Sequence, residues 1–315
     1  MVPTSRVRAV ADAGLAGLVG PGDHGGADAP TAVVRDVFEA LAGACGVTFF
    51  VWAQHHGPVR MLAASANRSL KDRYLSDLCA GRLLGGVAFA YLRRPGSPAV
   101  TARPVPGGYR VDGEAPWVTS WGLADVFAVA ARAGDDVVFF CLRGVESGAV
   151  RASAPLELMV MQASGTVRLR FDGLLVPDSD VIACQPMADW QAMDRVVTAQ
   201  PNPAVFGIAA TCCRLLGPDA GALDEERLEC RARGYDLADQ NRTDDDHLAR
   251  LVEARAWSYD LALRSAAALV AAAGGRSMER THPAQRLLRE ASFYSIQAQT
   301  PALRGATLAR LQPRS

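Results

Sequence analysis

The chain has 315 residues, half of them hydrophobic, which is enough for one large domain or for two to three smaller ones with buried cores. Acidic and basic residues are equal in number, so neither nucleic acid nor an anionic membrane surface is expected as a partner. Seven scattered cysteines without a C-x-x-C pair argue against a disulfide framework and a zinc knuckle, and they indicate a cytoplasmic protein. We expect neither a signal peptide nor a membrane-spanning segment.

The first zone, residues 1–84, has the pattern of a short helical region. Apolar side chains recur at helical spacing in three segments, and a glycine-rich loop precedes the first of them. The three segments are Thr31 to Cys45, Val51 to Ala64 and Leu70 to Gly81. We therefore predict a shortened helical N-terminal region over residues 1–84.

Residues 85–186 have the pattern of a β-domain. The apolar alternation shortens to every second residue, as in Tyr109-Arg-Val-Asp and Val137-Val-Phe-Phe-Cys. Turn signals at Pro106-Gly-Gly and Gly134-Asp-Asp separate these runs. Because the runs are joined by short turns, we predict a central antiparallel β-sandwich.

From residue 187 the helical pattern returns. Apolar side chains repeat at helical spacing from Val252 to Val270. We expect Thr243 to cap the start of this helix and Gly274-Gly275 to end it. Residues 187–315 are predicted to form a four-helix bundle.

The last helix is expected to begin at Thr281, with Pro283 in its first turn, and to end before Pro301. With this helix the chain has the order helices, strands, helices. The predicted fold class is accordingly α+β, with several domains.

A series of short motifs follows this order along the chain. The motifs are Gly14 to Pro21, Lys71 to Gly81, Gly108 to Gly113, Trp117 to Ser120, Phe171 to Pro177, Gly274-Gly275 and Pro283 to Ala291. Taken together they resemble the acyl-CoA dehydrogenase family over nearly the whole chain. The resemblance implies the fold of that family, while the reaction has to be inferred from the site residues.

The resemblance implies bound FAD and oxidation of an acyl thioester, carried by coenzyme A or by an acyl-carrier protein. In this family, hydride passes from the substrate to the flavin while a carboxylate removes a proton. Trp117 is the residue expected against the flavin ring, and Thr119 and Ser120 are expected to hydrogen-bond its polar edge. For Trp117 the alternative is ordinary packing within the sheet.

At several positions the chain departs from the family pattern. Tyr91-Leu92 stands where a Thr-Glu pair is usual, and Ala271 replaces a customary glutamine. The segment from Arg231 to Tyr235 is no clean counterpart of the family's Arg-x-x-Phe-Gly, which helps to bind the cofactor pyrophosphate across a subunit boundary. Ala298 occupies the position of the commonest catalytic glutamate, so the chain resembles a divergent member that lacks this base.

Asp194 is the first candidate for a replacement base. In relatives similar to isovaleryl-CoA dehydrogenase the catalytic glutamate precedes an arginine at the start of the first bundle helix, and this chain reads Met193-Asp-Arg195 there. The side chain of Asp194 is one methylene shorter than glutamate. The alternative is a helix-start aspartate that is favoured by the helix dipole and paired with Arg195.

His55 and His56 are the other candidates for acid–base chemistry, since a histidine can titrate near neutral pH. The alternative is a capping or surface pair that ends a helix before Gly57-Pro58. No histidine or carboxylate stands three or four residues away to complete a metal site, so no metal is expected.

The leading hypothesis is a flavin-dependent oxidoreductase that acts on an acyl thioester. Two alternatives remain: a non-catalytic partner subunit or repurposed scaffold in a hetero-oligomer, and a flavin-dependent hydroxylase of the same fold. We expect a homodimer or tetramer formed through the C-terminal bundle, because its apolar surface exceeds what one bundle needs.

Overall fold

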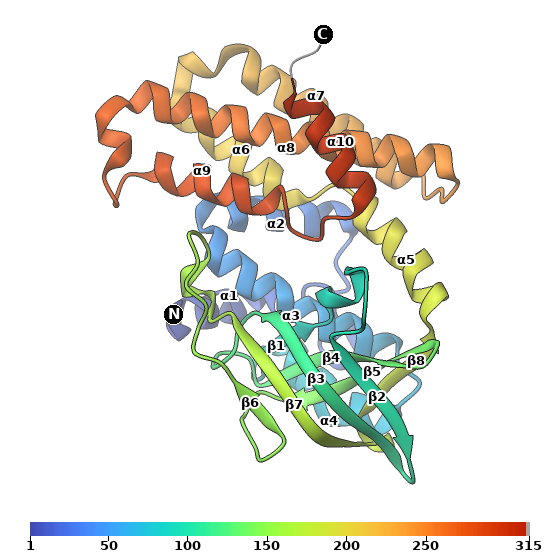
Figure 1. Ribbon diagram of the computed structural model, residues 1–315. Helices are drawn as coiled ribbons and strands as arrows, with labels where there is room; N and C mark the ends of the chain where they lie inside the picture. The colour runs from blue at the N-terminus through green and yellow to red at the C-terminus, as the bar shows by residue number, and fades with distance from the viewer. Residues whose placement is uncertain (313–315) are drawn as a thin grey trace. The chain divides into compact units, whose positions relative to one another are not determined.

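The computed structural model describes residues 1–312, which form two compact units (Figure 1). The first unit holds residues 1–34 and 47–191, and the second holds residues 35–46 and the chain from residue 192 onward. The elements follow the predicted order of helices, strands and helices. The N-terminal helices share one unit with the strands, except that residues 35–44, the larger part of α2, belong to the unit of the C-terminal helices.

A single sheet of eight strands dominates the first unit, in the order β6-β7-β3-β2-β4-β5-β8, with β1 paired to β4. The strands are β1 (Gly85–Ala88), β2 (Val100–Val105), β3 (Gly108–Val118), β4 (Val126–Ala133), β5 (Asp136–Arg143), β6 (Val150–Ala152), β7 (Val167–Pro177) and β8 (Val181–Pro186). Both turn signals join neighbouring antiparallel strands as predicted. Gly107 and Gly134 adopt positive φ angles of 79° and 65° there, a conformation that glycine reaches without strain.

The predicted antiparallel β-sandwich differs from the observed sheet in two strand pairings. β1 and β2 both pair with β4 in parallel, so the sheet is mixed. Parallel neighbours require a long connection, and residues 89–125, which contain the β2–β3 hairpin, connect β1 to β4. Short turn signals identify antiparallel hairpins but give no information about such distant pairings.

The core of the first unit lies on the central strand β4, whose residues 126–131 are all buried. Apolar side chains of two helices, including Val59, Leu62, Leu70 and Leu75, join the same hydrophobic cluster. A strand covered on both faces has a continuous apolar run, which explains the sequence Val126-Phe-Ala-Val-Ala-Ala.

Four helices precede the sheet: α1 (Thr4–Val10), α2 (Thr31–Ala44), α3 (Gly46–Ala64) and α4 (Arg68–Cys79). The C-terminal helices are α5 (Met187–Ala199), α6 (Pro203–Leu216), α7 (Gly221–Asp239), α8 (Asp245–Ala273), α9 (Pro283–Tyr294) and α10 (Pro301–Leu311). Within the second unit α8 is the central helix and lies against α6, α7, α9 and α10 (Figure 1). None of the helices within residues 1–312 combines the length and apolarity needed to cross a lipid bilayer.

The ends of the C-terminal helices differ in detail from the prediction. Asp244, not Thr243, caps α8 by accepting a hydrogen bond from the backbone N–H of His247 at 3.0 Å. α9 begins at Pro283 after His282, and a further helix that the sequence did not predict begins at Pro301. A proline can occupy the first turn of a helix as well as follow its last turn, so the sequence allowed both interpretations of Pro301.

The second half of α2 and α6 approach each other closely through glycines. A Cβ atom on Gly43 would lie 2.6 Å from the backbone oxygen of Gly207. A Cβ atom on Gly207 would lie 2.0 Å from the backbone oxygen of Glu39. Because backbone atoms cannot move aside as a flexible side chain can, this contact requires glycine.

We therefore expect Gly207→Ala to destabilise the protein by about 1–3 kcal/mol, the usual cost of overpacking. Gly305 on α10 offers a matched control, because a Cβ atom there would meet nothing within 4 Å. Gly305→Ala should stabilise by about 0.5–1 kcal/mol through helix propensity. Urea unfolding of both variants measures the difference, and equal midpoints would contradict the proposed close contact.

Candidate functional site

Trp117 lies near the end of β3, where the register with β7 is broken between Ala115 and Val118. Its backbone has a φ angle of 60°, which is uncommon for a residue with a side chain. The side chain is 51% exposed. Packing within the sheet would bury the indole, so this exposure favours contact with a flat ligand over the packing alternative.

The residues that follow Trp117 are held by a second segment of the same unit. The backbone N–H of Ser120 donates to the Ser164 oxygen at 2.9 Å, and that of Trp121 donates to the Gly165 oxygen at 3.1 Å. The buried hydroxyl of Thr119 lies 3.0 Å from the hydroxyl of Thr166. This turn therefore has a fixed backbone, and the Thr119 hydroxyl already has a protein partner.

The Ser120 hydroxyl differs from that of Thr119. It is fully buried and has no hydrogen-bond partner within residues 1–312, and its backbone φ angle is 70°. A buried hydroxyl without a partner is energetically unfavourable. The exposed indole of Trp117 fits the ring of a flavin, and the hydroxyl of Ser120, three residues later, fits the polar edge of that ring. The Thr119 hydroxyl could hydrogen-bond a flavin only in addition to its contact with Thr166.

His55 is buried inside α3, and both of its ring nitrogens have protein partners. The backbone N–H of Gly85 donates to Nδ1 at 2.9 Å, so Nε2 carries the proton and donates to the Ala16 oxygen at 3.1 Å. Burial lowers the pKa of His55 to about 4. The neutral ring thus connects the N-terminal segment, α3 and β1, and these contacts favour a structural role over proton transfer.

His56 is also buried, and its ring meets that of Trp52 edge-on with 4.5 Å between the ring centroids. Burial lowers the pKa of His56 well below its ordinary value, and the nearby His55 and Arg60 act in the same direction. The alternative of a capping or surface pair is wrong, because α3 continues through Gly57 and Pro58 to Ala64. The sequence Gly57-Pro58 had indicated the end of a helix, but both residues lie inside α3.

Asp194 lies in the middle of α5, not at its start. Its side chain is buried, and its backbone oxygen accepts a hydrogen bond from the Thr198 hydroxyl at 2.6 Å. Arg195 forms its ion pair with Asp245, at 3.2 Å. The alternative of a helix-start aspartate paired with Arg195 therefore does not describe Asp194.

The loop between α9 and α10 carries Ala298, where the family has its commonest glutamate. Ala298 adopts a left-handed backbone conformation with a φ angle of 52°. Its neighbour Gln297 is held twice: its side-chain oxygen accepts from Asn202 at 3.1 Å, and its backbone oxygen accepts from Arg255 at 3.4 Å. These two hydrogen bonds fix the position of the loop, although the methyl side chain of Ala298 cannot accept a proton.

Arg255, a residue that the sequence pattern did not single out, is buried on α8. Its guanidinium also donates to the backbone oxygens of Thr198 and Gln200, and to the Tyr259 hydroxyl at 2.7 Å. Arg255 therefore joins the end of the helix that carries Asp194 to the loop that carries Ala298. A charged residue beside the apolar stripe of α8 was the signal that could have revealed it.

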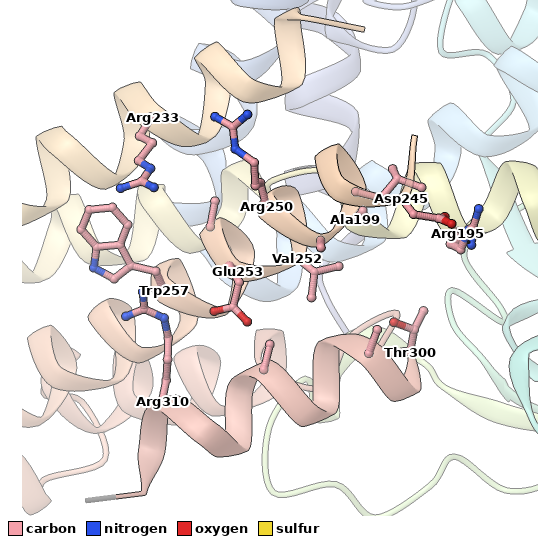
Figure 2. A pocket seen from close by; sticks show the side chains of 15 residues that line it. Arg195, Ala199, Arg233, Asp245, Arg250, Val252, Glu253, Trp257, Thr300 and Arg310 are labelled. Atoms are coloured by element: carbon pink, nitrogen blue, oxygen red, sulfur yellow. Dashed lines mark ion pairs between the residues drawn. The ribbon is translucent and has the colours of Figure 1, made fainter. Parts of the chain in front are cut away.

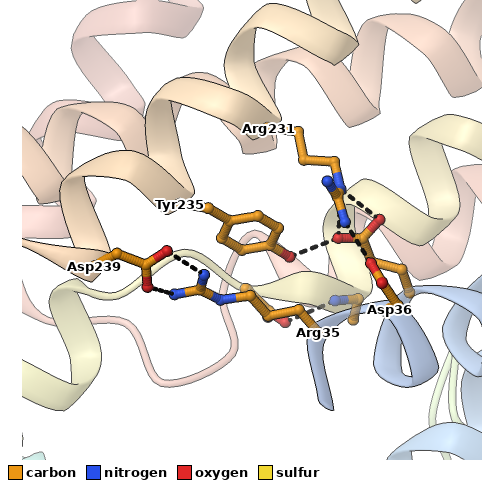
Figure 3. Close-up of polar contacts among 8 residues, drawn as sticks. Arg35, Asp36, Arg231, Tyr235 and Asp239 are labelled. Atoms are coloured by element: carbon orange, nitrogen blue, oxygen red, sulfur yellow. Dashed lines mark hydrogen bonds and ion pairs between the residues drawn. The ribbon is translucent and has the colours of Figure 1, made fainter. Parts of the chain in front are cut away.

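A polar network connects residues 35–39 of α2 to α7 (Figure 3). Arg231 pairs with Glu39 at 2.8 Å and with Asp36 at 2.6 Å, and Arg35 pairs with Asp239 at 2.7 Å. The Tyr235 hydroxyl donates to Glu39 at 2.6 Å, and burial raises the pKa of this tyrosine. Arg231 and Tyr235 thus bind carboxylates of their own unit. They lie in the segment that is no clean counterpart of the family's Arg-x-x-Phe-Gly.

Within residues 1–312 the structure contains no group of three or more histidine, cysteine, aspartate or glutamate side chains that could hold a metal ion.

Comparison with known proteins finds similarities to acyl-CoA dehydrogenases in sequence and in fold. Residues 1–82 match the family model "Acyl-CoA dehydrogenase, N-terminal domain". The mitochondrial 2-methylacyl-CoA dehydrogenase of Solanum tuberosum is 24% identical over 95% of this chain and 80% of its own length. Benzylmalonyl-CoA dehydrogenase of Aromatoleum aromaticum is 28% identical, but over 56% of this chain and 48% of its own.

Solved structures show the same fold. Butyryl-CoA dehydrogenase from Megasphaera elsdenii superposes with a TM-score of 0.76 at 17% identity, covering 97% of this chain and 89% of its own. The FAD complex of PigA gives 0.80 at 18% identity, covering 99% and 90%. The fold is that of the acyl-CoA dehydrogenases. In sequence, residues 1–82 are similar to the N-terminal domain of these enzymes.

The contacts of His55 predict a loss of stability in acid. Its pKa is lower in the folded protein than in the unfolded chain, so the unfolded state binds a proton first as the pH falls. Stability should be complete above about pH 6.5 and decline toward about pH 4, by on the order of 3 kcal/mol. Urea unfolding at pH 7.5 and 5.0, on wild type and His55→Gln, measures this decline. An equally steep decline in the variant would contradict the assignment to His55.

Proposed function

We propose that the protein is a flavin-dependent oxidoreductase that acts on an acyl thioester, and that its dehydrogenation is slow for its family. The half-exposed Trp117 carries this proposal, because its position near the end of β3 matches the flavin contact of the family and packing does not explain its exposure. A bound flavin would accept hydride from the substrate. The protein residues would hold the ring, orient the thioester and remove a proton.

Trp117 would lie against the flavin ring, and the Ser120 hydroxyl would hydrogen-bond the polar edge of that ring. Both residues belong to a turn whose backbone is fixed by the segment from Ser164 to Thr166. A fixed turn supports the proposal, because the ordering of these groups then adds little to the entropic cost of binding.

Asp194 is the proposed base. Asp194 is a buried residue, and the end of its helix is fixed by the hydrogen bonds of Arg255 to Thr198 and Gln200. Removal of a proton by a positioned base contributes typically about 10²–10⁴-fold to a rate. Because Ala298 supplies no such group and Asp194 is shorter than glutamate, we expect only part of this factor.

Two observations favour the alternative of a non-catalytic partner subunit. Ala298 cannot accept a proton, and Arg231 is already neutralised by Glu39 and Asp36. A flavin-dependent hydroxylase would also dispense with a base at position 298. Measurements of flavin content and of acyl-CoA turnover separate the dehydrogenase from these two alternatives.

The first experiment tests the flavin contact. Trp117→Ala is expected to weaken flavin binding about fivefold or more, since an aromatic contact contributes on the order of 1 kcal/mol. Leu175→Ala is the control, because Leu175 is also a large exposed apolar residue, on β7 of the same unit. The visible absorption spectra of the purified proteins report the flavin content. Equal flavin content in both variants would show that the site lies elsewhere.

The second experiment tests the base. Turnover of a panel of acyl-CoA substrates with an artificial electron acceptor is measured on wild type, Asp194→Ala and Ala298→Glu. We expect weak wild-type activity, a loss of about tenfold or more in Asp194→Ala, and a gain in Ala298→Glu. Robust wild-type activity that survives Asp194→Ala would refute both the slow reaction and the proposed base.

A further inference from the structure

Five exposed arginines gather on one face of the sheet in the first unit. They belong to four strands that lie side by side in the order β6, β7, β3 and β2 (Figure 1). We call this set the arginine face, and its members are Arg103, Arg110, Arg151, Arg168 and Arg170. The same four strands contain three acidic residues, so in a chain with zero net charge they carry a local excess of positive charge.

The strand register places arginines directly opposite one another at two positions. Arg103 of β2 lies opposite Arg110 of β3, and Arg151 of β6 lies opposite Arg170 of β7. Side chains at directly opposite positions point to the same face of a sheet, and two like charges there repel each other. The sheet therefore maintains two repulsive pairs that contribute nothing favourable to its own stability.

The two pairs lie on the same face of the sheet. Glu114 lies opposite Arg170 and follows Arg110 by four residues on β3, so side-chain alternation turns Glu114 and Arg110 to the same side. On β3 the residue after each of these two is fully buried on the other face. The ion pair between Arg168 and Glu114 at 3.9 Å brings Arg168 to the exposed face as well.

The carboxylates of these strands leave much of the positive charge without a close partner. Asp112 serves two arginines at once, at 3.5 Å from Arg103 and 4.0 Å from Arg110. Arg151 and Arg170 form no ion pair with any residue between 1 and 312. Ion pairs this long between exposed side chains contribute little, so the guanidinium groups stay available to a ligand.

A pocket of the helical unit shows an arginine opposite a carboxylate instead (Figure 2). Arg195 of α5 forms an ion pair with Asp245 of α8 at 3.2 Å there. Arg250 and Glu253, three residues apart on α8, line the same pocket. In the sheet, the corresponding cross-strand positions hold like charges, so the arginine face is no ordinary network of ion pairs.

An apolar side chain lies within the arginine face. Leu175 of β7 is 66% exposed and lies directly opposite Arg110, so the two side chains share one face. The phosphate backbone of a nucleic acid offers no apolar group to Leu175, whereas a polypeptide carries carboxylates and apolar side chains together. This combination favours a protein partner.

We propose that the arginine face binds an acidic segment of a partner protein. Guanidinium groups match the geometry of carboxylates and can bind them through two parallel hydrogen bonds. Arginine is enriched at protein interfaces, and complementary charge speeds the encounter of two proteins. Bound carboxylates would also remove the repulsion within the two arginine pairs. The proposal goes beyond the proposed function, because it requires neither the flavin contact nor the base.

The test measures the fluorescence anisotropy of a labelled poly-L-glutamate peptide titrated with the whole chain at low ionic strength, where screening is weakest. We expect binding that the double variant Arg151→Gln/Arg170→Gln weakens about fivefold or more. The matched control is Arg68→Gln/Arg143→Gln, which removes the same charge from exposed arginines of α4 and β5, in the same unit but outside the four strands. This control should bind the peptide like the wild type.

Three results would overturn the proposal. The first is no binding of the peptide, and the second is equal affinity of the two double variants. The third is tighter binding of a mixed-sequence DNA duplex or of phosphatidylserine vesicles, which would assign the face to nucleic acid or to a lipid surface.

The melting temperature gives a second measurement on the same variants. Because Arg151 and Arg170 repel each other and lack ion pairs, Arg151→Gln/Arg170→Gln should melt at or above the wild-type temperature. A lower melting temperature would show that these arginines stabilise the sheet, and it would overturn their assignment to a binding face.

Discussion

One buried arginine determines how the helical unit presents its candidate residues. Arg255 is almost fully buried and has no carboxylate partner in the part of the chain that the structure describes. Its charge is compensated by backbone oxygens at the end of α5 and in the loop before α10. Oxygens at the C-terminal end of a helix carry partial negative charge, so they can stabilise a cation. The position of Asp194 and that of the loop at Ala298 therefore depend on the same side chain.

The sheet unit positions its candidate residues by another physical means. Trp117 and Ser120 both adopt positive φ angles, a strained conformation for residues with a side chain, at about 1–3 kcal/mol each. Backbone hydrogen bonds to Ser164 and Gly165 maintain this turn. The strain leaves one large ring exposed and one hydroxyl without a partner. Sites of stored strain are often sites of ligand contact, which agrees with the flavin assignment.

The sequence predicted the elements well where the pattern is local. Hairpin turns at Gly107 and Gly134 follow from glycine and its neighbours, and helix α8 follows from the spacing of its apolar residues. Contacts between residues distant in the sequence leave no such pattern. The parallel pairing of β1 with β4 and the two hydrogen bonds of His55 both join distant segments. The sequence therefore indicated His55 and Asp194 as candidates for acid–base chemistry, but it did not predict the contacts that each residue makes.

The network around Arg231 has a consequence for how the helical unit folds. Arg231 and Arg35 pair with three carboxylates of this unit, Asp36, Glu39 and Asp239, and Tyr235 also bonds to Glu39 (Figure 3). Both arginines of this segment therefore have their carboxylate partners inside the unit. The ion pairs of this segment can form as the unit folds, and they require neither a ligand nor a second subunit.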